Sequence, residues 1–144
     1  MTGNARSIAR EWMSASEPFA TIVRGDCMVP DIADGECIAI DPTAPVSAGD
    51  LVIVVKRPER MQDGEPPGAL KRLVGRIKRS RIPFELREDE ELEPCLFVEM
   101  TNPPKRMFVP YSAIGAVFKC IGKARRSDDG QSAWIEPWPT EAAS

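Results

Sequence analysis

Short apolar runs separated by turns dominate the pattern of hydrophobic and polar positions along the chain. Many of the runs are rich in β-branched residues, and proline, glycine or charged residues end them, which is typical of strands. The expected strands are residues 19–23, 36–40, 51–56, 69–78, 82–87, 96–101, 107–109 and 114–121. Gly75 interrupts one run and indicates a β-bulge. The pattern therefore predicts a mainly β domain.

The first segment of the chain has a helical pattern instead. Residues 4–16 place apolar side chains near one face of a helix, and Pro18 ends it. One short helix is not a helix-turn-helix DNA-binding domain, which needs about three helices. In the tail, Trp134 and Trp138 are expected to pack back onto the domain or onto a partner. The predicted parts are an N-terminal helical arm (1–18), a β domain (19–126) and a C-terminal tail (127–144).

The composition narrows the possible chemistry. The chain has 144 residues, a net charge of -3 and no histidine. The acidic balance provides no overall positive field for nucleic acid. The lack of histidine excludes Ser-His-Asp and Cys-His catalytic sites and zinc sites with histidine ligands. A nucleophilic enzyme would need a lysine, a carboxylate or the N-terminal amine as its base.

The cysteines indicate reduced thiols. No Cys-x-x-Cys pair occurs, so neither a zinc ribbon nor a redox site is expected, and we expect no metal or cofactor. Cys37, Cys95 and Cys120 lie in apolar runs and are expected in the core. The chain shows no signal peptide and no apolar run of the ~20 residues that a membrane span needs. These features predict a cytoplasmic location without membrane contact.

Three motifs follow one another in a fixed order. They are residues 25–30 (GDCMVP), 48–54 (AGDLVIV) and 70–73 (LKRL). They resemble the S24 peptidases, the family of LexA, UmuD and lambda-type repressors, with its Gly-x-Ser-Met-x-Pro turn, Gly-Asp-hydrophobic strand and Lys-Arg-hydrophobic strand. Residues 102–103 (NP) and 114–117 (IGAV) resemble later family motifs. The resemblance spans roughly residues 19–124 and implies a twisted β-sheet fold of the LexA and signal-peptidase type.

In this resemblance a cysteine replaces the nucleophilic serine. Cys27 occupies the serine position, and a thiolate there remains a strong nucleophile. Gly25 permits the backbone bend, Pro30 stiffens its exit and Met28 is expected to anchor the turn in the core. Backbone N–H groups of such a turn can stabilise an oxyanion. The candidate turn residues beside Cys27 are Gly25, Asp26, Met28 and Pro30.

The base that the resemblance implies is Lys71. Its apolar neighbours Leu70 and Leu73 favour burial, which disfavours the charged form of a lysine and lets it act as a base. By contrast, Asp34 and Glu36 flank a turn glycine and are expected to be solvated.

Self-cleavage is not expected. Self-processing members of the family cut an Ala-Gly or Cys-Gly bond upstream of the nucleophile, whereas only Thr2-Gly3 and Arg24-Gly25 precede Cys27 here. Signal peptidases have similar Ser-Met-x-Pro and Lys-Arg motifs. This chain lacks their membrane anchor and the Pro-Gly-Asp that follows their Lys-Arg pair.

Two functions remain open on the sequence. The first is a peptidase with a Cys27–Lys71 dyad, related to SOS or phage-repressor regulation. The second is a catalytically inactive S24 fold that serves as a dimerisation or regulatory module. The resemblance implies a homodimer and a protein partner such as a repressor, a polymerase or a recombinase filament. Residues 114–121 are the expected dimer edge, since an apolar edge strand invites pairing.

Overall fold

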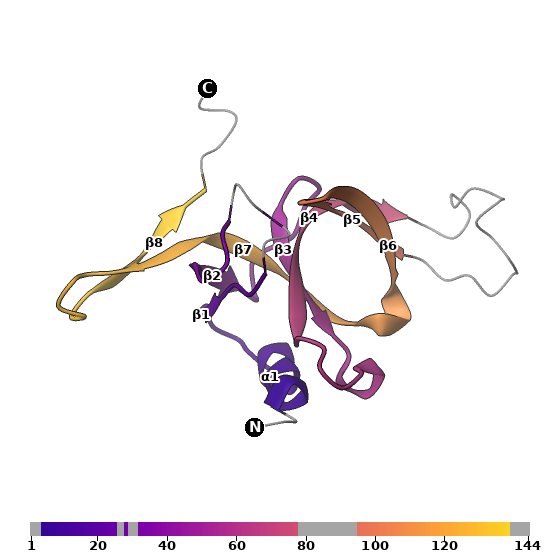
Figure 1. The fold of residues 1–144 in the computed structure, drawn as a ribbon, viewed down its shortest axis with the longest axis horizontal. Coiled ribbons are helices and arrows are strands. Elements are labelled where there is room, and N and C mark those ends of the chain that lie inside the picture. The colour runs from indigo at the N-terminus through magenta and orange to yellow at the C-terminus, as the bar shows by residue number, and fades with distance from the viewer. Residues whose placement is uncertain (1–3, 26–27, 29–31, 78–94, 139–144) are drawn as a thin grey trace, which may run out of the picture.

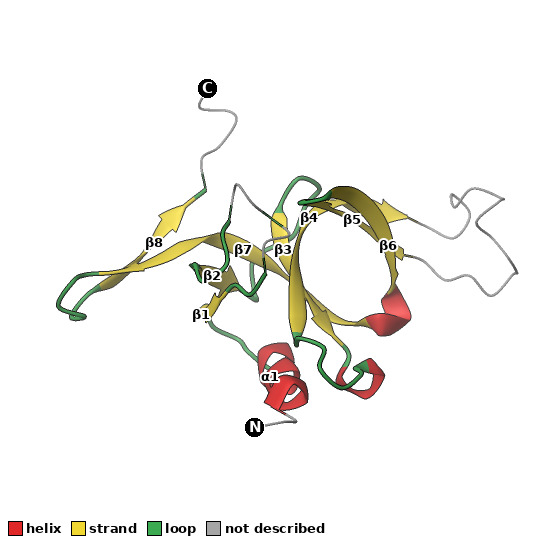
Figure 2. Ribbon diagram, in the orientation of Figure 1, coloured by secondary structure: helices red, strands yellow, loops and turns green. Residues whose placement is uncertain are grey.

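The computed structural model describes residues 4–25, 28, 32–77 and 95–138. Within these residues, eight strands form an antiparallel sheet in the order β1-β2-β7-β3-β4-β5-β6, with β8 paired to β7. The strands are β1 (Phe19–Ile22), β2 (Cys37–Asp41), β3 (Leu51–Lys56), β4 (Gly68–Ile77), β5 (Cys95–Thr101), β6 (Pro104–Pro110), β7 (Ile114–Arg126) and β8 (Ala133–Pro137). The helices are α1 (Asn4–Met13) and the 3-10 turns η1 (Pro58–Arg60) and η4 (Tyr111–Ala113). Strands β4, β5 and β6 curve round one side, and the β7–β8 hairpin extends on the other (Figures 1 and 2).

The predicted mainly β fold with a short N-terminal helix is confirmed. Each expected strand that falls on described residues is present, and the expected strand at 82–87 lies outside them. The bulge predicted at Gly75 appears as a register shift between Leu73 and Gly75 opposite β5. The helix ends at Met13 rather than at residue 16, and the N–H of Ala15 closes its last turn on the carbonyl of Trp12 at 3.0 Å.

Strand β3 is buried on both faces, which explains its unbroken apolar sequence. Leu51, Ile53 and Val55 belong to one core cluster, and Val52 and Val54 belong to another. Successive residues of a strand point to opposite faces of the sheet, so both sides of β3 are covered. The sheet therefore separates two cores, one beneath α1 and β2 and one inside the curve of β4, β5 and β6.

Helix α1 packs on the first core cluster. Ala9 is fully buried, and the ring of Trp12 stacks on that of Phe19 with centroids 5.7 Å apart. The Arg6 guanidinium donates to the carbonyl oxygen of Met61 at 2.7 Å, which joins the helix to the loop after η1. Of the helices in the described part of the chain, none is long and apolar enough to cross a membrane.

Strand β7 is central, and the prediction that residues 114–121 form a dimer edge is therefore wrong. Lys119 is paired both with Asp41 on β2 and with Val52 on β3, so both sides of β7 are occupied there. Apolar residues in a strand indicate that the strand is buried. They do not distinguish a central strand from an edge strand that pairs with a partner.

The tail returns to the sheet. Strand β8, which the sequence pattern did not predict, pairs with the second half of β7 from Gly122↔Pro137 to Arg126↔Ala133. The indole Nε1–H of Trp138 donates to the carbonyl oxygen of Cys120 at 2.8 Å, and Trp138 packs against the first core cluster. The expected packing of the tail is thus confirmed for Trp138, whereas Trp134 is 53% exposed.

Replacement of Gly122 by alanine is expected to separate β8 from β7. An added Cβ would collide with the backbone carbonyl of Glu136, and a strand backbone cannot move aside as a flexible side chain can. We expect Gly122→Ala to lower the free energy of unfolding by about 1–3 kcal/mol and to expose Trp138 to a fluorescence quencher.

The matched control is Gly75→Ala, because an added Cβ at this other strand glycine meets nothing within 4 Å. Equal quenching in Gly122→Ala, Gly75→Ala and the unchanged protein would contradict the close approach of β8 to Gly122.

Candidate functional site

The loop between β1 and β2 carries the candidate nucleophile turn, and backbone hydrogen bonds hold its two ends together. The N–H of Val23 donates to the carbonyl oxygen of Glu36, and the N–H of Gly35 donates to that of Val23, both at 2.8 Å. The N–H of Ile32 donates to the carbonyl oxygen of Met28 at 3.0 Å. The described residues on both sides of the turn are thus hydrogen-bonded in place.

Gly25 adopts the conformation that its place in the motif predicts. Its φ is 98°, in the left-handed region that side-chain-bearing residues rarely adopt. Its N–H donates to the Asp34 carboxylate Oδ1 at 2.7 Å. Asp34 is exposed, as expected, but it also fixes the entrance of the turn. The residues around Asp34 gave no signal for this role, because the N–H that it accepts lies nine residues away along the chain.

Met28 anchors the turn in the core, as predicted. It is 1% exposed, and both Met28 and the fully buried Ile32 belong to the core cluster beneath α1. Asp26, Cys27 and Pro30 lie outside the described residues. On the described residues, a carboxylate thus holds Gly25 before the candidate nucleophile, and core packing holds Met28 after it.

An ion pair ties this loop to the central strand. The Lys123 ammonium on β7 lies 2.8 Å from the Glu36 carboxylate. The hydrogen bond from Lys123, followed by that from the Ala33 N–H, lowers the pKa of Glu36 below its usual range. Glu36 is thus partly buried and paired, where the sequence predicted a solvated side chain.

Lys71 lies in β4 beside buried apolar residues, as predicted. Leu70 and Leu73 are 7% and 2% exposed, and Lys71 itself is half-buried. Its register partner on β3 is Val52, which is also the partner of Lys119 on β7. Directly paired residues share a face of the sheet, so the two lysines flank Val52 in one cross-strand row.

The sequence pattern gave no sign of Lys119 as a neighbour of this row. Its ammonium lies 3.9 Å from the Asp50 carboxylate, in the turn that precedes β3. Only the strand order brings Lys119 close, because 48 residues separate it from Lys71 (119 minus 71). A positive charge that acts on a group near this row can therefore come from Lys71 or from Lys119.

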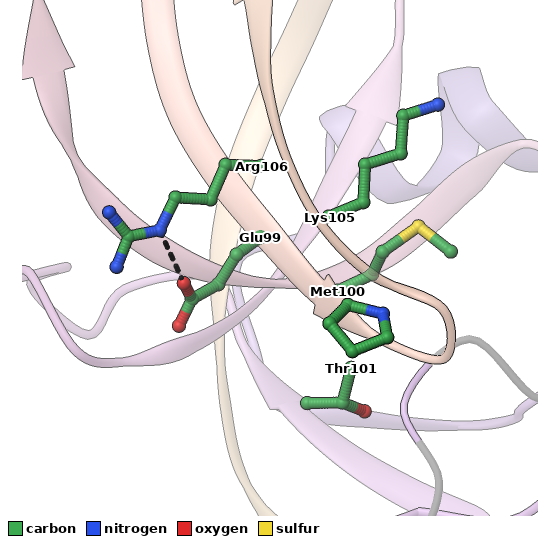
Figure 3. A pocket seen from close by; sticks show the side chains of 6 residues that line it. Glu99, Met100, Thr101, Lys105 and Arg106 are labelled. Atoms are coloured by element: carbon green, nitrogen blue, oxygen red, sulfur yellow. Dashed lines mark hydrogen bonds and ion pairs between the residues drawn. The ribbon is translucent and has the colours of Figure 1, made fainter.

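An open pocket lies at the turn between β5 and β6 (Figure 3). Its volume is about 430 Å³, and an ion pair between Glu99 and Arg106, 3.0 Å long, crosses its side. The lining residues are Glu99, Met100, Thr101, Pro104, Lys105 and Arg106. Glu99 is the register partner of Arg72, the residue after Lys71, so the pocket borders the strand that carries the predicted base. Of the predicted site residues that the structure describes, Gly25, Met28 and Lys71, none lines it.

The family comparison covers the region of the motifs. The profile of the family described as Peptidase S24-like matches residues 3–77, more than half of the chain. The chain belongs to the S24-like peptidase family. The matched span includes the positions of both Cys27 and Lys71.

The chain is also similar to a phage repressor. It is 38% identical to Repressor protein C of Rhizobium phage 16-3 over 58 residues, which are 40% of this chain and 22% of that protein. The similarity thus spans about a fifth of the length of that relative. No solved structure matches the chain.

Loss of the Asp34 carboxylate is expected to loosen the entrance of the turn. Asp34→Ala removes the acceptor of the Gly25 N–H, whereas Asp34→Asn keeps an oxygen that can accept it. We expect faster hydrogen exchange of the Gly25 amide and a loss of about 1 kcal/mol of stability in Asp34→Ala, and a smaller change in Asp34→Asn. Equal exchange of this amide in both variants and in the unchanged protein would contradict the bond.

The Glu36–Lys123 pair should make stability depend on pH. The folded pKa of Glu36 lies below its unfolded value, so its contribution is present above the usual glutamate pKa of about 4.3 and is lost as the pH falls through the folded value. We expect Glu36→Gln to cost about 0.5 kcal/mol near pH 7 and progressively less below about pH 4.

Denaturant unfolding at a series of pH values measures this difference. The control is Glu17→Gln, an exposed glutamate before β1. A Glu36→Gln difference that stays constant down to strongly acidic pH would refute the assigned pair.

Proposed function

We propose that this S24-like domain cleaves peptide bonds, with Cys27 as nucleophile and Lys71 as base, as part of a phage-repressor-like regulator. The observation that carries the proposal is the anchored loop, with Gly25 in the left-handed region bonded to Asp34 and Met28 in the core. A nucleophile needs a supporting shell of this kind, because small displacements of a reacting group cost much of its rate.

The position of Lys71 on β4 supports its proposed role as the base. Lys71 is half-buried, and its neighbours along the strand, Leu70 and Leu73, are buried. The open pocket beside β4 would let a peptide approach this strand from outside the sheet. The family match includes both positions.

The proposed reaction has two steps. First, the Cys27 thiol gives its proton to the Lys71 amine, and the thiolate sulfur attacks the scissile carbonyl carbon. The C–N bond then breaks, the leaving amine takes the proton from the Lys71 ammonium, and a thioester remains on Cys27. Second, a water gives a proton to the Lys71 amine, and its oxygen attacks the thioester carbon. The C–S bond then breaks, the Cys27 sulfur takes the proton from the Lys71 ammonium, and the acid product leaves the site.

The packing of α1 favours cleavage of a separate chain over self-cleavage. Ala9, Trp12 and Arg6 hold the segment before β1 on the core, so this segment would have to unpack before entering its own site. This observation also favours the second candidate function, a module that binds without cutting. In that role the domain would pair with a second copy and bind a regulatory protein such as a repressor, a polymerase or a recombinase filament.

We infer a cytoplasmic location from the thiols. Cys37 and Cys120 form no disulfide bond within the described residues, and burial raises the pKa of Cys120 to about 11. Such a thiol is neutral and unreactive near pH 7. Thiols that are not joined in disulfide bonds suit a reducing compartment.

The pH dependence of Cys27 alkylation by iodoacetamide tests the dyad. Cys95 and Cys120 are buried, so only the partly exposed Cys37 needs replacement, by serine. We expect Cys27 to react as a thiolate with a pKa below the ~8.5 of a free thiol, and we expect Lys71→Ala to shift its reaction profile toward that value.

The matched control is Lys119→Ala, which removes the other lysine of the same cross-strand row. A shift of the reaction profile in Lys119→Ala but not in Lys71→Ala would show that Lys119, and not Lys71, is the base. A free-thiol profile in all variants would leave the binding module as the function. Digestion of a peptide library, followed by mass spectrometry, then tests hydrolysis, which both Cys27→Ala and Lys71→Ala should abolish.

A further inference from the structure

Strand β6 is an edge strand at one end of the sheet. One of its sides pairs with β5 along its whole length, and among the strands that the structure describes none pairs with its other side. Met107 and Val109 pack against the core inside the curve of β4, β5 and β6, whereas Arg106 and Phe108 are exposed. Successive strand residues point to opposite faces, so β6 is anchored by one face and open on the other.

Two aromatic rings and an arginine form the open face. The rings of Phe97 and Phe108 are stacked with their centroids 4.9 Å apart, and Phe108 is 42% exposed. The Arg106 guanidinium lies 5.8 Å from the centre of the Phe97 ring, and its Nε–H donates to the Glu99 carboxylate at 3.0 Å (Figure 3). These contacts hold the exposed side chains in place. Aromatic and arginine side chains contribute most to the energy of protein interfaces, so this face is suited to a protein partner.

The charge of β6 is positive and only partly neutralised. Glu99 neutralises Arg106, whereas Lys105 makes no ion pair and no hydrogen bond within the described part of the chain. The two terminal nitrogens of Arg106 also make no hydrogen bond with a described residue, so they remain able to bind a second carboxylate. The whole chain has a net charge of -3, which makes this edge a local exception. The charge therefore favours an acidic partner.

The prolines of β6 determine which of its backbone groups face outward. In an antiparallel ladder every second pair of residues exchanges two N–H···O bonds. Pro104 and Pro110 have no N–H, so their pairs with β5 belong to the other kind, and a single phase satisfies both because their positions are both even. Residues 104, 106, 108 and 110 then direct their backbone groups away from β5. Arg106 and Phe108 provide the two outward N–H groups.

We propose that β6 binds an extended acidic peptide segment of another protein, which joins the sheet as an antiparallel strand. In this register one peptide residue exchanges backbone hydrogen bonds with Phe108, and the residue two positions later exchanges them with Arg106. The side chains of these two peptide residues lie on the open face, beside Phe108 and Arg106. An apolar residue suits the first position, and aspartate or glutamate suits the second. From its N-terminus to its C-terminus the segment therefore has the pattern apolar-x-acidic.

The charges disfavour two other occupants of this edge. Pairing with β6 of a second copy would concentrate four positive side chains, Lys105 and Arg106 of each chain, along one short edge. A single-stranded nucleic acid would stack a base on Phe108, but it would leave the outward backbone groups unused and would bring phosphates toward Glu99. An acidic peptide strand uses both the backbone groups and the charge.

Titration of the full ¹⁵N-labelled chain, followed by NMR, tests this site. The probe is the N-acetylated and C-amidated peptide Ser-Thr-Val-Thr-Glu-Thr-Ser, and its matched control has glutamine in place of glutamate. We expect the amide signals of Arg106 and Phe108 to shift, and we expect the glutamate peptide to bind about 5-fold more tightly than the glutamine peptide. Arg106→Gln should remove most of this difference. Arg126→Gln, at an exposed arginine of β7, should preserve it.

N-methylated peptides test the addition of a strand. A methyl group on the nitrogen of the valine or of the glutamate removes an N–H that points toward β6, whereas one on the threonine between them removes an N–H that points away. We expect the first two peptides to bind about 10-fold more weakly or worse, and the third to bind within about twofold of the unmodified peptide.

The absence of any shift at Arg106 and Phe108, or equal affinity for the glutamate and glutamine peptides, would overturn the proposal. Equal effects of the three methyl groups would exclude strand addition, and tighter binding of Ser-Thr-Glu-Thr-Val-Thr-Ser would refute the antiparallel direction. Shifts caused by oligothymidylate alone, or by protein concentration alone, would assign the edge to a nucleic acid or to a second copy. Lys71→Ala should bind the peptide as the unchanged protein does, which separates this site from the proposed cleavage.

Discussion

The pairing of β7 with three strands is the constraint on which the rest of the structure depends. β7 has 13 residues, and it pairs with β3 through its first half, with β2 on its opposite edge and with β8 beyond β3. Lys119 and Lys123 each have register partners on both sides. A strand in this position must be long enough to support three neighbours, and its backbone hydrogen bonds are then satisfied along most of its length. The helix, the loop and the tail all attach to the frame that it creates.

The local elements were predictable because they depend on local pattern. The apolar run of β3, the bulge at Gly75 and the helix at the N-terminus each follow from residue types and spacing. The order of the strands does not, because an apolar residue reports burial and not the identity of its neighbour. This is why β7 was expected at an edge. β8 escaped prediction for a related reason, since its five exposed residues show no alternation of apolar and polar positions and its pairing partner is set by the turn.

In the candidate site too, the features set by local sequence were predictable and those set by strand order were not. Gly25 and Met28 behave as the turn motif predicts, because a left-handed bend and an anchoring apolar side chain are local requirements. The neighbours of Lys71 were predictable for the same reason. The closeness of Lys119 to that row and the Lys123–Glu36 pair depend on strand register, which no local pattern specifies. Cys27 itself lies outside the described residues, so its part in the dyad rests on the motif and on the family.

Strand β8 and the loop between β1 and β2 share one residue of β7. Lys123 is the register partner of Ile38 on β2 and of Glu136 on β8, and its ammonium pairs with Glu36 at the end of the loop. A force that moves β8 therefore acts on the same backbone position that holds the loop. Packed strands shift as units rather than deform continuously, so a displacement of β8 would move Lys123 and with it Glu36. Strand β8 and the geometry of the candidate turn are thus linked through a single strand position, whether the domain cuts a peptide or only binds one.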